Sequence, residues 1–202
     1  EGTKSADRVA FYNCTALNEV VLPEGMVTLS TAMFLGCTSL SNVNLPNSIS
    51  TIPTGCFYGC KSLKNINFDN CNIEGLQDSA VIAGYSNGGD LKNISITNSK
   101  VSYNGNAGSE GYFSMVIGRL HKDTTNMTNI FIDDCEIDCN KYTGALTGNI
   151  NKGNNCVLNA KNIYCDIKIR CDGAAIGLVG RNRGTLNIEN VFSNEIDRIY
   201  LN

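Results

Sequence analysis

The carboxylates of the stretch DDCEIDCN (133–140) are the residues whose types and spacing most directly suggest chemistry. They are Asp133, Asp134, Glu136 and Asp138. Paired carboxylates act as general acid and base on glycosidic bonds, and clustered carboxylates bind Ca²⁺. In an extended strand, however, Glu136 and Asp138 flank Ile137, so that Ile137 faces the core and both carboxylates face solvent.

An alignment of this stretch with similar ones tests whether the carboxylates cluster. It equates Val101, Ile137, Ile167 and Ile196. Glu136 then lies beside Lys100 and Asp166, and Asp138 begins a column that continues with Lys168 and Asp197. A column that alternates in charge is typical of an exposed cross-strand ladder, whereas a catalytic or metal site concentrates like charges. The pattern therefore favours a structural ladder over an active site.

Cysteine and histidine give little support to a metal site or a nucleophile. Cys135 and Cys139 have a C-x-x-x-C spacing without a matching second pair, and both are expected to point inward with Ile137. The only histidine, His121, lies in the polar loop RLHKDTTN, so no catalytic triad is indicated. The glycine-rich stretches lack the form of a phosphate-binding loop. We expect no metal, no cofactor and no catalytic residues.

Aromatic side chains in loops are the candidates for a contact surface, because tyrosine is favoured at recognition sites. The candidates are Tyr85, Tyr103, Tyr112, Phe113 and Tyr142. Arg119, Arg181 and Arg183 lie beside glycines that recur along the chain and could form a small basic patch. The alternatives are that each ring only stacks on the next coil and that the arginines are solvated or paired locally.

The elements that position these residues repeat along the chain. Cys14, Cys37 and Cys60 are 23 residues apart, and the same spacing relates equivalent Leu, Val or Ile, and Phe positions. A fixed period of this length is the signature of stacked supersecondary units. Equivalent cysteines should stack about 4.8 Å apart along the coils. We therefore expect most of the ten cysteines to be buried, unpaired thiols.

Residues 1–75 contain this 23-residue unit. LNEVVLP and LSNVNLP alternate as short strands that end at Pro, and we expect MVTLSTAMF to add a second short strand and a tight return. The unit C-x-x-L-x-x-V-x-L-P resembles the BspA-like leucine-rich repeats. That resemblance implies a solenoid and a surface protein that adheres to host or matrix proteins.

Residues 76–202 follow a looser period. Gly84, Gly118, Gly148 and Gly180 recur at intervals of 34, 30 and 32 residues, each followed by alternating apolar stretches such as MTNIFID. This pattern predicts parallel β-helix coils of about 30–34 residues, which we expect to be right-handed and stacked coaxially on the leucine-rich repeats. The 28 asparagines suit tight turns with left-handed backbone. IGLVGRNRG and, more weakly, GALTGNINKG resemble the GLUG motif of surface β-helices.

The chain as a whole predicts a mainly β repeat solenoid. Its net charge of −3 gives no broad footprint for nucleic acid or an anionic membrane, and no apolar run is long enough to span a bilayer. We expect a non-enzymatic binding or adhesion segment of a larger, extracellular or cell-surface protein, with a protein or glycan as partner. The alternatives are a carbohydrate-active β-helix enzyme and an intracellular scaffold element.

Overall fold

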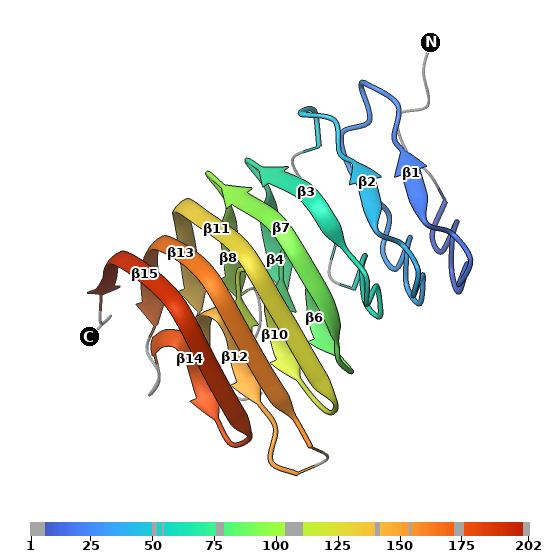
Figure 1. The fold of residues 1–202 in the computed structure, drawn as a ribbon. Helices are drawn as coiled ribbons and strands as arrows, with labels where there is room; N and C mark the ends of the chain where they lie inside the picture. The colour runs from blue at the N-terminus through green and yellow to red at the C-terminus, as the bar shows by residue number, and fades with distance from the viewer. Residues whose placement is uncertain are drawn as a thin grey trace.

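The chain folds as a parallel β-solenoid whose coils stack along one axis (Figure 1). The computed structural model describes residues 7–49, 52–53, 55–73, 80–102, 111–139, 142–153, 155–171 and 177–193 in full, and residues 74–75, 79, 103, 176 and 194–199 by their backbone alone. These parts consist of strands, turns and irregular segments, and they include no helix that could span a membrane. The expected fold class, a mainly β repeat solenoid, is confirmed.

The leucine-rich coils are held by three stacked columns of side chains. The short strands β1 (Glu19–Val21), β2 (Asn42–Asn44) and β3 (Lys64–Asp69) place Val20, Val43 and Ile66 in the core. The rings of Phe11, Phe34 and Phe57 stack with successive centroids 5.3 Å apart. The equal spacing of these positions in the sequence thus becomes a continuous core along the axis.

The repeated thiols form the third column. Cys37 Sγ donates to the carbonyl oxygen of Phe11 at 2.9 Å, and Cys60 Sγ donates to that of Phe34 at 3.1 Å. Cys14, on the first coil that the structure describes, is exposed. The expectation that the thiols at this repeat position are buried is therefore confirmed for Cys37 and Cys60 and wrong for Cys14.

Turns and irregular segments take the place of the second short strand that we expected between Met26 and Phe34. Within this range, only Thr28 forms an isolated β-bridge. Ala32 and Gly55 occupy one repeat position with φ of 56° and 79°, and Gly36 and Gly59 occupy another with φ of 77° and 76°. Left-handed residues at these points turn the chain sharply, so the segment cannot remain extended. Backbone bonds such as Phe34 N–H to Cys56 O still join neighbouring coils.

Longer coils follow, and they form two parallel sheets (Figure 1). The first joins β15, β13, β11, β7 and β3 in that order, with β8 and β4 attached, and the second joins β5, β9, β12, β10 and β6, with β14 paired to β12. The pairing of β3 with β7 links the leucine-rich part to the longer coils, as the coaxial arrangement predicted. The strands are β4 (Asn72–Gly75), β5 (Ser79–Ala80), β6 (Ala83–Ser86), β7 (Gly89–Thr97), β8 (Lys100–Tyr103), β9 (Phe113–Ser114), β10 (Ile117–Leu120), β11 (Thr124–Cys139), β12 (Thr143–Ile150), β13 (Val157–Cys171), β14 (Ile176–Asn182) and β15 (Thr185–Ile199).

The long strands bend at a column of asparagines. Asn65, Asn93, Asn129, Asn162 and Asn190 all have φ between 53° and 55°, a left-handed conformation that asparagine tolerates better than most residues. Each of the last four donates a side-chain N–H to the Oδ1 of the preceding member, at 2.8 to 3.1 Å. This asparagine ladder therefore fixes the same corner in the five coils that contain β3, β7, β11, β13 and β15.

The core of the long coils is apolar and contains most of the remaining cysteines. Inward-facing positions of β11 such as Ile130, Ile132 and Ile137 are at most 1 % exposed. Nine of the ten cysteines are buried, which confirms the expected burial. Burial raises the pKa of Cys56, Cys71 and Cys165 to about 12. These thiols are therefore neutral packing groups at physiological pH.

Candidate contact surface

The carboxylates of β11 lie among cations. Glu136 Oε1 is 3.4 Å from Lys100 Nζ and 3.1 Å from Arg170 Nη1, and Asp138 Oδ2 is 4.0 Å from Lys100 Nζ. All four side chains are partly exposed. The arrangement is a mixed-charge surface ladder, and its opposite charges compensate the acidic pair.

The register of this ladder differs from the predicted one by two residues on one side. Val101 pairs with Ile137 as expected, but Ile137 pairs with Ile169 rather than with Ile167. The prediction placed paired residues 30 positions apart, whereas the strands pair 33 positions apart up to Ile132 and 32 positions apart from Cys135. The change from 33 to 32 is a bulge, in which Asp133 and Asp134 lie opposite one residue of β13 and Asp134 has φ of 48°. Glu136 therefore lies opposite Lys168 and Asp138 opposite Arg170. The predicted pairing of Glu136 with Asp166 and of Asp138 with Lys168 is wrong.

The last pair of the predicted column, Lys168 with Asp197, joins β13 to β15. Lys168 pairs with Asp197 through the backbone, as predicted, while the side chain of Asp197 lies outside the described residues.

Cys135 and Cys139 point into the core with Ile137, as predicted. Their sulfurs lie 3.4 Å and 3.9 Å from the carbonyl oxygens of Ile96 and Val101. Burial raises the pKa of Cys135 to about 11 and raises that of Cys139 as well. Among the described residues, no group of three or more His, Cys, Asp or Glu side chains could hold a metal ion.

Three of the predicted aromatic residues meet on the sheet formed by β6, β10, β12 and β14. The rings of Tyr112 and Tyr142 stack with centroids 5.5 Å apart. The guanidinium of Arg119 lies 5.3 Å from the centroid of Tyr112 and 5.9 Å from that of Tyr85. Arg119 therefore joins rings that are far apart in the sequence.

Arg181 completes this arrangement. Its guanidinium lies 4.7 Å from the centroid of the Tyr142 ring, and its Nη1 donates to the Tyr112 hydroxyl at 3.3 Å. Cation–π contacts of this kind contribute about 0.5–1 kcal/mol each at exposed sites. They hold both arginines in defined positions while Tyr85, Tyr142, Arg119 and Arg181 keep part of their surface accessible.

Close packing of Tyr112 depends on a glycine. A Cβ at Gly148 would lie 2.5 Å from the Phe113 nitrogen and 2.8 Å from the Tyr112 Cβ. Only glycine lets the segment at 112–113 approach β12 this closely. The repeat glycine that the sequence singled out thus has a packing role beneath the aromatic cluster.

Three predicted contact residues do not offer a described, exposed ring. Phe113 is 0 % exposed, so its prediction as a contact residue is wrong: it faces the core from β9. Tyr112 is only 5 % exposed and supports its neighbours more than it offers surface. The side chain of Tyr103 lies outside the described residues.

The cluster extends across the junction of the two repeat types. The ring of Tyr58, from the leucine-rich part, stacks on Tyr85 with centroids 5.6 Å apart, and Tyr85 lies 5.0 Å from the His121 ring. Neither Tyr58 nor His121 was predicted here, because only the stacking of the coils brings them beside Tyr85. We call this set the Tyr–Arg surface: Tyr58, Tyr85, Tyr112, Arg119, Tyr142 and Arg181.

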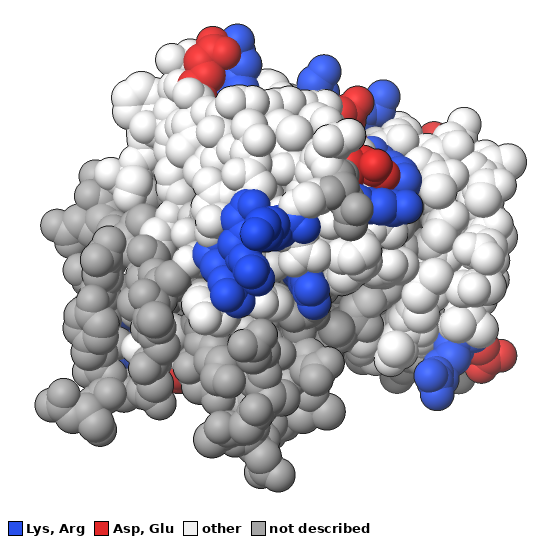
Figure 2. Space-filling view, turned by 90° about the horizontal axis from the view of Figure 1, so that it is seen from below, with Lys and Arg blue, Asp and Glu red and all other residues white. Residues whose placement is uncertain are grey.

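Basic residues also occupy the turns that follow these strands. Leu120, Ile150 and Asn182 are paired, so the segments after them stack at the lower end of the coils in Figure 1. Exposed Lys122, Lys152 and Arg183 lie in these turns. Figure 2 views the molecule from below and shows Lys and Arg side chains gathered near the middle of that face. The basic patch therefore includes two lysines that were not predicted.

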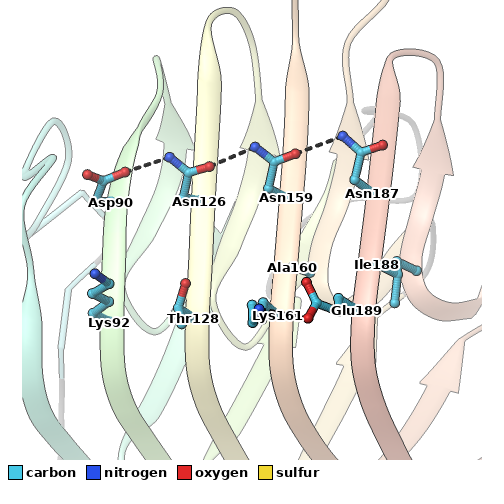
Figure 3. Close-up of a pocket in the computed structure, with 10 residues that line it drawn as sticks. All are labelled: Asp90, Lys92, Asn126, Thr128, Asn159, Ala160, Lys161, Asn187, Ile188 and Glu189. Carbon is cyan, nitrogen blue, oxygen red and sulfur yellow. Dashed lines mark hydrogen bonds and ion pairs between the residues drawn. The ribbon is translucent and has the colours of Figure 1, made fainter.

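A polar groove runs over another face of the solenoid (Figure 3). Its volume is about 680 Å³, and one wall is a second ladder in which Asn126, Asn159 and Asn187 each donate to the preceding member, beginning at Asp90. Lys161 and Glu189, 2.7 Å apart, lie on its other side. The repeated [D/N]-x-x-N spacing, as in NMTN and NAKN, is the signal that could have predicted both ladders.

These features define the chain as a parallel β-solenoid with ordered side-chain columns on its outer faces. The family model of the BspA type leucine rich repeat region matches residues 1–110 in six copies. The chain belongs to this family. The match extends beyond residue 75, where we expected the leucine-rich repeats to end, and does not reach the two GLUG-like stretches. Searches of curated proteins and of solved structures found no match.

Proposed function

We propose that this chain is a non-enzymatic binding segment of a secreted or cell-surface protein, and that it makes adhesive contacts through the Tyr–Arg surface. The observation that carries the proposal is the ordering of tyrosine rings and two arginines on one accessible face by stacking and cation–π contacts. Membership of the BspA type repeat family agrees with a role in binding. The GLUG-like stretches in the last coils agree with a surface location.

The physical advantage of this surface is its order before binding. Tyr and Arg supply much of the binding energy at protein interfaces. A partner that binds flexible side chains loses affinity to their ordering, at about 0.5–1.5 kcal/mol for each one. Arg119 and Arg181 are already held against Tyr112 and Tyr142, so much of this cost is met in the free protein.

The enzymatic alternative rests on the carboxylates of β11. Glu136 is within 3.4 Å of both Lys100 and Arg170, so this carboxylate is engaged in ion pairs with two cations. A polysaccharide-cleaving enzyme would show product release from pectin or alginate, with or without Ca²⁺. We expect no cleavage under either condition.

The compartment follows from the proposed role. Buried thiols with raised pKa values resist oxidation, so they are compatible with the extracellular medium. The same thiols would also suit the alternative, an intracellular scaffold element. Fractionation of cells that produce the full-length protein distinguishes the two, because only the proposed location gives protein at the surface or in the medium.

The binding experiment immobilises extracellular-matrix proteins and measures the retention of the chain. Tyr85→Ala and Tyr142→Ala remove rings from the Tyr–Arg surface, and Tyr164→Ala makes the same change on another face, where Tyr164 stacks on Phe131. We expect each of the first two variants to weaken binding about tenfold and the control to bind normally. Retention of no matrix protein together with no binding to matrix glycans, or equal effects of all three variants, would contradict the proposal.

A further inference from the structure

The cations of the Tyr–Arg surface and of the turns below it are arranged in register with the coils. Arg119, Asn149 and Arg181 occupy one column of paired residues, so the two arginines are two rungs apart. Lys122 and Lys152 each follow the paired residues Leu120 and Ile150 by two positions, so they occupy neighbouring rungs. Rungs are about 4.8 Å apart, which gives cation spacings of about 4.8 and 9.6 Å along the axis.

Positive charge is concentrated here although the whole chain has a net charge of −3. The three turns contain Lys122, Lys152 and Arg183 and a single acidic residue, Asp123. Among the described residues, no ion pair involves these three cations, in contrast to Lys100 and Lys161 on other faces. Such a surface attracts an anionic ligand.

The spacing favours one class of polyanion. An extended peptide places side chains on the same side about 6.7 Å apart, which matches neither one rung nor two. Each sugar ring advances an extended polysaccharide by about the length of one rung. A chain with an anionic group on each ring or on alternate rings therefore stays in register with cations on successive coils.

The tyrosines beside the cations suit the same class of ligand. Sugar rings present C–H groups to aromatic side chains and hydroxyl groups to polar ones. The half-buried rings of Tyr85 and Tyr142 and the amide of Asn151, which accepts from Arg119 Nε at 3.3 Å, supply both kinds of partner next to the basic residues.

We propose that the Tyr–Arg surface and the basic turns below it bind a linear anionic polysaccharide that lies along the solenoid axis. This inference rests on the proposed binding function and names a ligand class for the same surface. The shared chemistry is a repeated carboxylate or sulfate on a sugar chain.

The test measures binding of the chain to polygalacturonate, which carries carboxylates, and to heparin, which also carries sulfates. Neutral dextran, poly-L-glutamate and a DNA oligonucleotide serve as comparison ligands, each at low and at physiological ionic strength. The double variant Lys122→Gln/Lys152→Gln removes two cations from the surface. Lys64→Gln/Lys92→Gln is the matched control, because Lys64 and Lys92 are exposed lysines on neighbouring rungs of another face.

We expect binding to at least one acidic polysaccharide, weakened by salt and weakened roughly tenfold by the first double variant, with the control unchanged. Binding only to polygalacturonate assigns a uronate ligand, and binding only to heparin assigns a sulfated one. Equal binding to dextran, tighter binding to poly-L-glutamate or DNA, or equal effects of both double variants would overturn the inference. If no polysaccharide binds while a matrix protein is retained in a Tyr85-dependent manner, only this inference fails.

Discussion

The asparagine ladder allows a prediction whose size follows from the structure. Asn129 donates to Asn93 at 2.8 Å and accepts from Asn162 at 2.9 Å, and its φ is 55°. Asn129→Ala removes both hydrogen bonds and places an alanine in the left-handed region. Asn129→Gly removes the same bonds without steric cost. Asn126→Ala removes two hydrogen bonds from the other ladder, which begins at Asp90, at a position whose φ is not positive.

The expected losses of unfolding free energy can be estimated for each variant. An exposed hydrogen bond contributes about 0.5 kcal/mol, at the lower end of the usual range, so two of them contribute about 1 kcal/mol. The left-handed conformation costs an alanine about 1 kcal/mol more. We therefore expect N129A to lose about 2 kcal/mol and both N129G and N126A to lose about 1 kcal/mol each.

Urea unfolding followed by circular dichroism measures these differences, with wild-type chain in parallel. The ranking is the sensitive part of the experiment, because N129A and N129G break the same hydrogen bonds. If N129A were as stable as N129G, the left-handed corner would carry no steric cost, and the reasoning would be refuted. If all three variants matched the wild type, the ladder bonds would contribute nothing to stability.

Four further predictions concern packing, thiol ionisation, thiol reactivity and surface charge. Gly148→Ala should destabilise the chain by about 1–3 kcal/mol through overpacking, whereas Gly177→Ala, with nothing within 4 Å of the added Cβ, should be neutral in the same unfolding assay. Burial raises the pKa of Cys135 from 9.0 to about 11, so this thiol ionises at a lower pH in the unfolded chain than in the folded one. The urea concentration at the unfolding midpoint should therefore be constant below pH 9 and decrease between pH 9 and 11. At neutral pH iodoacetamide should modify the exposed Cys14 before any buried thiol, as mass spectrometry of the peptides would show. Glu136→Ala should cost less than about 1 kcal/mol by thermal or urea unfolding, because its ion pairs are partly exposed; a larger loss would mean that the ladder is a major source of stability.

The sequence was most informative where one environment recurs at a constant interval. Phe11, Phe34 and Phe57 are 23 residues apart and stack directly, because every leucine-rich coil has nearly the same path. The long coils do not share this regularity. Members of the Asp90 ladder are separated by 36, 33 and 28 residues, so no single period relates their positions.

The wrong part of the β11 register comes from an ambiguity in the apolar pattern. Ile167 and Ile169 are similar residues two positions apart in β13, so alternation alone gave no reason to choose between them as the partner of Ile137. The separation of paired residues also changes from 33 to 32 at Asp133 and Asp134, so no constant offset relates the two strands. A bulge of this kind depends on backbone geometry that the apolar pattern does not record.

The Tyr–Arg surface could be predicted only in part for a related reason. Residue type identified Tyr85, Tyr112 and Tyr142 as candidates, but their meeting depends on Arg119 and on the space left by Gly148. Phe113 is the first residue of β9 and directly follows Tyr112; it is buried in the core, whereas Tyr112 contacts Arg119 and Tyr142. Such differences between neighbours become visible only when the strand direction is known.

The two asparagine columns also bear on how such a molecule can change length. Asn126 and Asn159 are equivalent, so deleting residues 126–158 would bring Asn159 opposite Asp90 and Asn162 opposite Asn93, with the same amide partners available. The chain could thus gain or lose one whole coil while the asparagine side chains on either side of the junction keep equivalent hydrogen-bond partners. Deleting one residue between Asn126 and Asn129 would instead shift one of these two asparagines out of register with its column. Selection on such genes should therefore accept whole modules more readily than small insertions at the corners.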